Sequence, residues 1–144
     1  MNDLRLHILD TDTLSAYHRG HPEVIARYSS LPVTMRAIAV VTAEEVLRGR
    51  FAQINQAKNQ QNLIRAYDFL QEAVAKLSQI PILRFDERGV AQYERLKYLK
   101  SRVGTLDLRI AAVVLVNNGI LITANQRHFG QIPGLSTEDW PRTP

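Results

Sequence analysis

Short apolar segments alternate with helical segments along the whole chain, and this alternation constrains the fold more than any other feature of the sequence. The strand-like segments are residues 4–9, 37–41, 81–85 and 120–123, and a last short strand is expected near residues 135–140. Strands that alternate with helices form a parallel sheet covered by helices on both faces. The sequence therefore predicts one α/β domain over residues 1–144, a three-layer sandwich around a short parallel sheet of four to five strands.

Local signals predict where the helices begin and end. Thr42 precedes a helical pattern, and Glu45 three residues later completes a capping box. Thr105 is expected to cap a second helix that carries Asp107 in its first turn. Gly119 is expected to end that helix in the left-handed conformation.

The composition excludes several classes of protein. With no cysteine, the chain has no disulfides, no thiolate metal sites and no cysteine nucleophile. No apolar run approaches the ~18 residues of a membrane span, and residues 1–5 do not open like a signal peptide. We therefore expect a cytoplasmic protein with no membrane association.

The charges are unevenly distributed along the chain. There are 18 Lys and Arg against 14 Asp and Glu, and five of the acids occur in three short spots. These five are Asp10, Asp12, Glu44, Glu45 and Asp107. The rest of the chain then has 9 acids against 18 bases. A basic body around a few acids suits a polyanionic substrate approached through bound cations, although ordinary solubility charge also explains it.

Three acids occur where a parallel sheet gathers functional groups. Asp10 follows the first strand, Glu45 lies near the start of the helix after the second, and Asp107 lies in the first turn of the helix before the fourth. Side chains at the carboxyl ends of parallel strands converge. Like charges that close repel unless a cation neutralises them, and carboxylates suit hard cations such as Mg²⁺. This pattern indicates metal-assisted phosphoryl transfer or hydrolysis.

Each of these acids also has a purely structural explanation. Asp10 can form a turn after its strand, Glu45 can serve the capping box, and Asp107 can interact with the helix dipole. Glu44 has Arg48 one turn further along and is expected at the surface, whereas Glu45 has the small residue Gly49 on its own face. That difference favours a ligand-binding role for Glu45.

Four segments in the order and spacing found here resemble the motifs of PIN-domain proteins. They are residues 9–14 (LDTDTL), 42–49 (TAEEVLRG), 104–112 (GTLDLRIAA) and 122–129 (ITANQRHF). No single segment is specific, but together they span nearly the whole chain. The subgroup they resemble most is the VapC-like toxins of bacterial and archaeal toxin–antitoxin pairs.

The resemblance implies a PIN-like fold and an endoribonuclease that depends on Mg²⁺ or Mn²⁺. Asp10, Glu45 and Asp107 match the three family carboxylates, with Asp10 and Asp107 as primary metal ligands. Residues expected to orient ligands or water around them are Thr11, Asp12, Thr123 and Asn125. The resemblance also implies an RNA substrate such as transfer RNA, a homodimer, and a cognate antitoxin as protein partner.

Two positions depart from the family pattern. Asp12 stands where the family usually has Asn, which adds a charge to the site. The usual fourth acid falls near His128, where this chain has no carboxylate. These departures leave open whether one or two metal ions bind, and they support an alternative in which the chain is a weakly active or inactive PIN-like binding module.

Two further interpretations depend on weaker patterns. The Asp10-Thr11-Asp12 sequence also occurs in haloacid-dehalogenase-type phosphatases, but Leu14 stands where those enzymes have Thr or Val, and their later Lys and acidic pair are missing. A basic segment after the third strand is either a solvated helix face or a surface that steers RNA. The residues proposed to contact nucleic acid are Arg88, Lys97 and Arg109.

Overall fold

The computed structural model describes residues 4–141. In chain order its elements are β1 (His7–Leu9), α1 (Thr11–His18), α2 (Pro22–Ser30), the 3₁₀-helix η1 (Val33–Met35), β2 (Arg36–Ala39), α3 (Val40–Gln56), α4 (Gln60–Leu77), β3 (Ile82–Leu83), α5 (Glu87–Leu96), the 3₁₀-helix η2 (Lys97–Leu99), α6 (Lys100–Val103), α7 (Thr105–Val116), β4 (Ile120–Ile122), α8 (Gln126–Phe129) and β5 (Ser136–Glu138).

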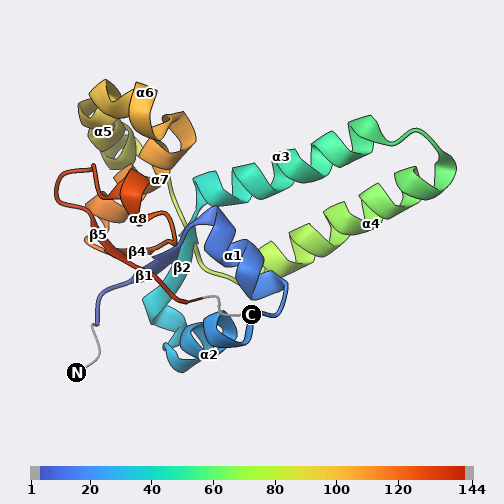
Figure 1. Ribbon diagram of the computed structural model, residues 1–144, viewed down its shortest axis with the longest axis horizontal. Coiled ribbons are helices and arrows are strands. Elements are labelled where there is room, and N and C mark those ends of the chain that lie inside the picture. Colours follow the sequence, from blue (N-terminus) through green and yellow to red (C-terminus); the bar gives the residue numbers. More distant parts are fainter. Residues whose placement is uncertain (1–3, 142–144) are drawn as a thin grey trace.

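The five strands form one parallel sheet in the order β3-β2-β1-β4-β5. This confirms the predicted α/β class and the short parallel sheet (Figure 1). The chain builds outward from β1 to β2 and β3, and then crosses to the other side of β1 to add β4 and β5. The order therefore reverses between β1 and β4, and ligands bind at such a switch point in open α/β sheets.

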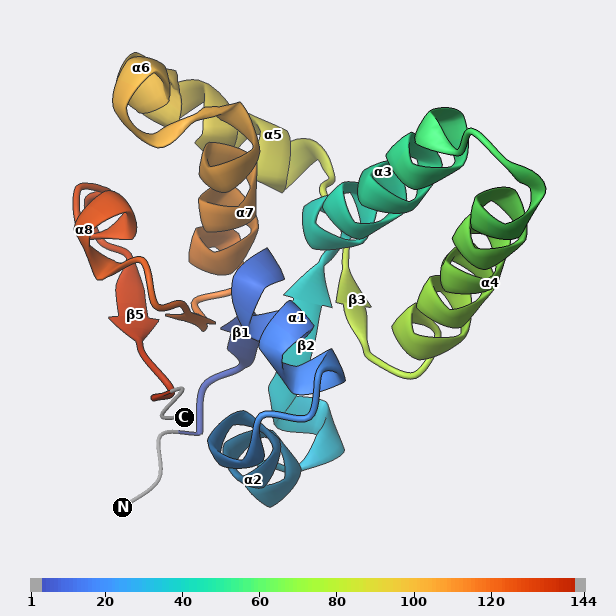
Figure 2. The ribbon, with the colours of Figure 1, turned by 45° about the vertical axis from the view of Figure 1, so that its right-hand side comes forward.

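Alternating side chains of the strands enter two separate cores. Ile8 and Leu121 pack with α5, α7 and α8 on one face, whereas Leu9 and Ile122 pack with α1, α2 and the base of the α3–α4 hairpin on the other. Figure 2 shows α5 and α7 apart from α1 and α2 across the sheet. A strand directs successive side chains to opposite faces, so this sheet needs apolar residues at consecutive positions. The three-layer prediction is confirmed.

Helices α3 and α4 form a long antiparallel hairpin that projects from the body of the molecule (Figure 1). Several large apolar side chains of α4 are exposed on it, namely Leu63, Ile64, Tyr67 and Phe69. From the sequence, Leu63, Ile64, Tyr67, Phe69 and Leu70 could line either the core or a dimer face. The core alternative is wrong for the four exposed residues, whereas Leu70 is partly buried.

The predicted helix ends are wrong at three places. Helix α3 begins at Val40 rather than after Thr42, so Thr42 is buried inside the helix and Glu45 is not part of a capping box. Helix α7 is capped by Gly104, whose φ of 94° suits glycine, rather than by Thr105. At the other end of α7, Asn118 and not Gly119 adopts the left-handed conformation.

Gly119 is required for a different reason, which is the close approach of the chain to β1. A Cβ at this position would lie 2.8 Å from both the Leu6 carbonyl oxygen and Ile8 Cδ1. The missing side chain lets the N–H of Ile120 donate to the Leu6 carbonyl oxygen at 2.8 Å. Gly119 thus sets the entry of β4 beside β1.

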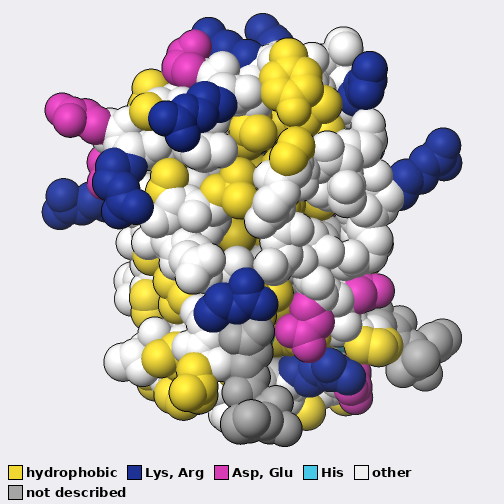
Figure 3. Space-filling view, turned by 90° about the vertical axis from the view of Figure 1, so that its left-hand side faces the viewer, with side chains coloured by type: hydrophobic (Ala, Val, Ile, Leu, Met, Phe, Trp, Pro, Cys, Tyr) yellow, Lys and Arg dark blue, Asp and Glu magenta, His cyan; other side chains and the backbone are white. Residues whose placement is uncertain are grey.

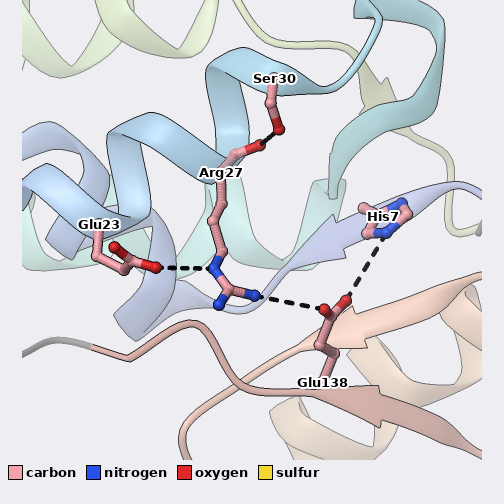
Figure 4. A network of polar contacts seen from close by, with 5 residues as sticks. All are labelled: His7, Glu23, Arg27, Ser30 and Glu138. Carbon is pink, nitrogen blue, oxygen red and sulfur yellow. Dashed lines mark hydrogen bonds and ion pairs between the residues drawn. The ribbon is translucent and has the colours of Figure 1, made fainter. Parts of the chain in front are cut away.

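A polar network joins β1, β5 and α2 (Figure 4). Glu138 at the end of β5 faces the buried His7 of β1 at 3.8 Å and Arg27 of α2 at 3.7 Å, and Arg27 also pairs with Glu23 at 3.0 Å.

Among residues 4–141, no helix is long and apolar enough to cross a membrane.

Candidate active site

Four acidic side chains line one cavity at the carboxyl edge of the sheet. The cavity has a volume of about 240 Å³, and its lining residues are Asp10, Thr11, Asp12, Glu45, Asp107, Asn125 and Phe129. They come from the segments after β1 and β4 and from the early turns of α3 and α7. The structure therefore brings together the three carboxylates singled out from the sequence. It does so at the switch point between β1 and β4.

Asp10 is held rigidly because it also caps a helix. Its Oδ1 accepts the Thr13 backbone N–H at 2.8 Å, and its own N–H donates to the Ile122 carbonyl oxygen at 3.0 Å. The Thr13 hydroxyl donates to the same Ile122 carbonyl at 3.0 Å. One oxygen of the buried Asp10 carboxylate is thus used as a cap, and Oδ2 is the oxygen that remains for a ligand.

Glu45 is positioned by a threonine from another element. The Thr11 hydroxyl donates to Glu45 Oε1 at 2.5 Å. By contrast, Glu44 pairs with Arg48 on the exposed face of α3 at 2.6 Å. The predicted difference between these two neighbouring acids is confirmed. The actual start of α3 removes the capping explanation for Glu45 and leaves the cavity as its environment.

The arrangement of the acids changes the pKa of Asp107. The pKa of Asp107 is raised to about 6, first by burial, then by the charges of Glu45 and Asp10, and to a smaller extent by Asp12. His128 acts in the opposite direction, since its Nδ1 lies 4.0 Å from Asp107 Oδ2. A raised pKa of this origin is typical of functional carboxylates.

The loop after β4 contributes polar groups at the rim of the site. The buried Thr123 hydroxyl accepts the Asn125 N–H at 2.9 Å, and the Asn125 side chain accepts the His128 N–H at 3.3 Å. Asn125 and the exposed Asp12 line the cavity, whereas the buried Thr123 holds the loop through its hydrogen bond with Asn125. The expectation that all three residues orient groups around the carboxylates stays a prediction.

The donors in the cavity fit a hard divalent cation such as Mg²⁺ or Mn²⁺. The carboxylates offer oxygen ligands, and a cation would relieve both the burial of charge and the repulsion from Glu45 and Asp10 that raise the pKa of Asp107. Within residues 4–141, however, no three His, Asp or Glu side chains are placed closely enough to hold one ion by themselves. Mg²⁺ keeps several water ligands and is usually bound through one or two carboxylates, so a closed shell of protein ligands is not needed.

The three basic residues proposed to contact nucleic acid have other partners. Arg88 donates to the Val116 carbonyl oxygen at 2.9 Å, at the end of α7 opposite to Asp107. Lys97 pairs with Glu94 at 2.8 Å, and the half-buried Arg109 lies over the Tyr93 ring, 5.2 Å from its centroid. None of the three lines the acidic cavity.

Sequence reasoning missed two residues at the site. Phe129 is buried and lines the cavity, and His128 faces Asp107. His128 was noted only as the place of a missing acid, because nothing in the pattern showed which way the short helix α8 turns its side chains. The available signal was that His128 lies three residues after Asn125, the residue that caps α8.

Fold and site together define a class of protein: a small parallel α/β domain with an acidic cavity at the switch point of its sheet. The family model of the PIN domain matches residues 7–135, and the chain belongs to the PIN domain family.

The similar proteins include ribonuclease VapC1 of Haemophilus influenzae strain R2866, which is 29% identical over 95% of this chain and 99% of that protein. The tRNA(fMet)-specific endonuclease VapC of Salmonella typhimurium strain LT2 is 24% identical over 92% of this chain and 96% of that protein. The solved structure of VapBC-1 from nontypeable Haemophilus influenzae matches with a TM-score of 0.73 and 25% identity, covering 94% of this chain and 98% of that one.

Proposed function

We propose that this chain is a metal-dependent endoribonuclease and the toxin of a VapBC-type toxin–antitoxin pair. The observation that carries the proposal is the convergence of Asp10, Glu45 and Asp107 on one cavity in a PIN domain. The ribonuclease VapC1 and VapC endonuclease similarities, which extend over nearly the full chain, support the same activity. Membership of the PIN family also favours the nuclease over the phosphatase alternative.

The proposed cofactor is Mg²⁺ or Mn²⁺, held by Asp10 and Asp107, with Glu45 binding directly or through water. When bound, the ion would supply a Lewis acid that activates water and offsets charge on the scissile phosphate. The protein's own part is orientation: the Thr13 amide fixes Asp10, and the Thr11 hydroxyl fixes Glu45. Groups that orient ligands in this way commonly change activity when they are removed.

The proposed substrate is RNA, cut to leave 5′-phosphate and 3′-hydroxyl ends. Transfer RNA is the first substrate to test, because a similar VapC protein is named for its action on tRNA(fMet). A cytoplasmic location is part of this proposal.

The proposal also includes two protein partners, a cognate antitoxin and a second copy of this chain in a homodimer. The VapBC-1 complex among the similar structures and the exposed apolar side chains of α4 support a protein partner.

The test is cleavage of labelled total tRNA by the purified chain after treatment with EDTA. We expect cleavage only after Mg²⁺ or Mn²⁺ is added back. Asp10→Asn should lower the cleavage rate by at least ~100-fold, since this substitution removes a ligand charge. Glu44→Gln is the matched control, because Glu44 faces solvent and pairs with Arg48. Cleavage that persists in excess EDTA would contradict the metal-dependent mechanism.

The inactive binding module remains a second candidate because His128 replaces the expected fourth acid. The same assay separates the two. A chain that binds metal, shown by a rise in melting temperature with Mn²⁺, and that cuts no RNA at any metal concentration would be a binding module. A chain whose cleavage is abolished by Asp107→Asn would be the enzyme.

A further inference from the structure

One tyrosine stands out because it is exposed on a rigid support. Tyr98 is 69% exposed, more than any other aromatic residue in the described part of the chain. It lies in the middle of η2, and its neighbours Leu96 and Leu99 are both buried in the core. The backbone under Tyr98 is therefore fixed by packing, while the ring itself points away from the core. Tyr98 is therefore not a packing residue of the core.

The cations nearest in sequence do not cover the Tyr98 ring. Lys97 Nζ and the Arg109 guanidinium lie instead over the buried ring of Tyr93, at 5.8 and 5.2 Å from its centroid. Across residues 4–141, no aromatic ring or cation is found stacked against Tyr98. The Tyr98 ring thus presents a flat apolar face to solvent, on a backbone that the packing of Leu96 and Leu99 holds in place.

The surface around Tyr98 is basic. Residues 95–102 (RLKYLKSR) contain four Lys or Arg and no acid, and within this segment Arg95, Lys100 and Arg102 are exposed. Figure 3 shows Lys and Arg side chains gathered around hydrophobic ones at the top of this face, where α5 and α6 lie in Figure 1. An aromatic ring among cations is the combination that binds single-stranded nucleic acid, through base stacking and phosphate contacts.

The basic segment leads along the chain toward the acidic cavity. Helix α6 leads through Gly104 directly into the first turn of α7, which carries Asp107. Both η2 and α6 pack against α7, and α6 also packs against α8, the helix that Asn125 caps at the cavity rim. An RNA strand that crosses α6 is thereby directed toward the carboxylates.

We propose that Tyr98 is a stacking platform for an unpaired base of the RNA substrate, with Lys100 and Arg102 contacting the adjacent phosphates. This inference rests on the proposed nuclease function and names a residue that binds the substrate outside the acidic cavity. The positive charge around the ring favours a polyanion over an apolar protein surface as its occupant. Stacking is tolerant of sequence, so Tyr98 serves unpaired regions of RNA and not duplexes.

The test measures binding of a single-stranded RNA of about 12 nucleotides, with fluorescein at its 3′ end, to the full chain in EDTA. Stacking of one base is worth about 5- to 150-fold in affinity, so Tyr98→Ala should weaken binding by that factor and Tyr98→Phe by much less. Because the ring is uncharged, the dependence of affinity on salt should keep its slope in Tyr98→Ala and become shallower in Lys100→Ala. Phe51→Ala is the matched control, since Phe51 is an aromatic residue that is 51% exposed on α3.

A second readout is independent of affinity. The one native tryptophan, Trp140, is buried, so Tyr98→Trp adds an exposed reporter whose emission should fall when an unlabelled RNA base stacks on it. The proposal is overturned if Tyr98→Ala binds RNA like the parent, if the Tyr98→Trp emission is unchanged at saturating RNA, or if Tyr98→Ala converts a dimer to a monomer in sedimentation. A parent chain that neither binds nor cuts RNA would instead overturn the proposed function.

Discussion

Replacing Asp107 by Asn should abolish catalysis and at the same time stabilise the metal-free protein. In the folded chain the pKa of Asp107 is raised from its ordinary value of 3.8 to about 6, first by burial and then by Glu45 and Asp10. One pKa unit corresponds to about 1.36 kcal/mol, so ionised Asp107 costs at most about 3 kcal/mol of folding free energy. Because its side chain is 34% exposed, solvent screening reduces the figure to roughly half, about 1.5 kcal/mol.

The sign of this effect makes it depend on pH. The folded state holds the Asp107 proton up to a higher pH than the unfolded state, so stability falls as pH rises from about 4 to about 6. Below about pH 4 the carboxyl is protonated in both states and costs nothing. The advantage of Asp107→Asn should therefore be absent near pH 4 and complete above about pH 7.

Thermal unfolding in EDTA at several pH values measures the effect. A gain of about 1.5 kcal/mol corresponds to roughly 3–6 °C in melting temperature for a chain of this length. Asp68→Asn is the control, because Asp68 is exposed on α4 and away from the cavity, and it should change little at any pH. A lower melting temperature for Asp107→Asn at pH 7.5, or a gain that is equal at pH 4 and pH 7.5, would refute the idea that burial and the neighbouring carboxylates make ionised Asp107 unfavourable in the folded chain.

The remaining predictions concern positioning and backbone. Thr11→Val keeps the shape of the side chain but removes the donor to Glu45, so Mn²⁺ affinity measured by calorimetry should fall by about 10- to 100-fold, while Thr11→Ser should restore it. Gly119→Ala should lower the free energy of unfolding in urea by about 1–3 kcal/mol, because its Cβ would lie 2.8 Å from the Leu6 carbonyl oxygen. Gly49→Ala should raise it by about 0.5–1 kcal/mol, because an added Cβ in α3 meets nothing within 4 Å; a loss of stability there would contradict the open position of Gly49.

The sequence predicted the sheet and its acids well because both depend on strong local patterns. Consecutive apolar residues such as Ile8 and Leu9 require a sheet covered on both faces, and an acid at the end of such a strand reaches the carboxyl edge whatever the rest of the chain does. Helix ends were less predictable. The start of α3 at Val40 is set by the turn from β2 into the helix, and no side chain of Ala39 or Val40 signals it.

The orientation of surface residues was also beyond the sequence. Arg88, Lys97 and Tyr98 belong to one basic segment, and the pattern did not separate their roles. In the fold, α5 ends in the tighter turn of η2, which places Lys97 over Tyr93 and leaves Tyr98 exposed. Such a change of helical period within a few residues is decided by packing of Leu96 and Leu99, which is a tertiary effect.

The distribution of charge explains why the site would need a cation to work on RNA. Lys100 and Arg102 on α6 attract phosphates, but the cavity that follows along α7 is lined by four acids, which repel them. The carboxylates therefore repel the phosphates of RNA bound at the basic surface, and this electrostatic barrier at Asp107 persists unless positive charge is present in the cavity. Asp107→Asn lowers that barrier without supplying the cation, so we expect it to bind RNA in EDTA at least as tightly as the parent while cutting none. Weaker RNA binding by Asp107→Asn, measured by fluorescence anisotropy, would show that the carboxylate itself contacts the substrate and would contradict this electrostatic argument.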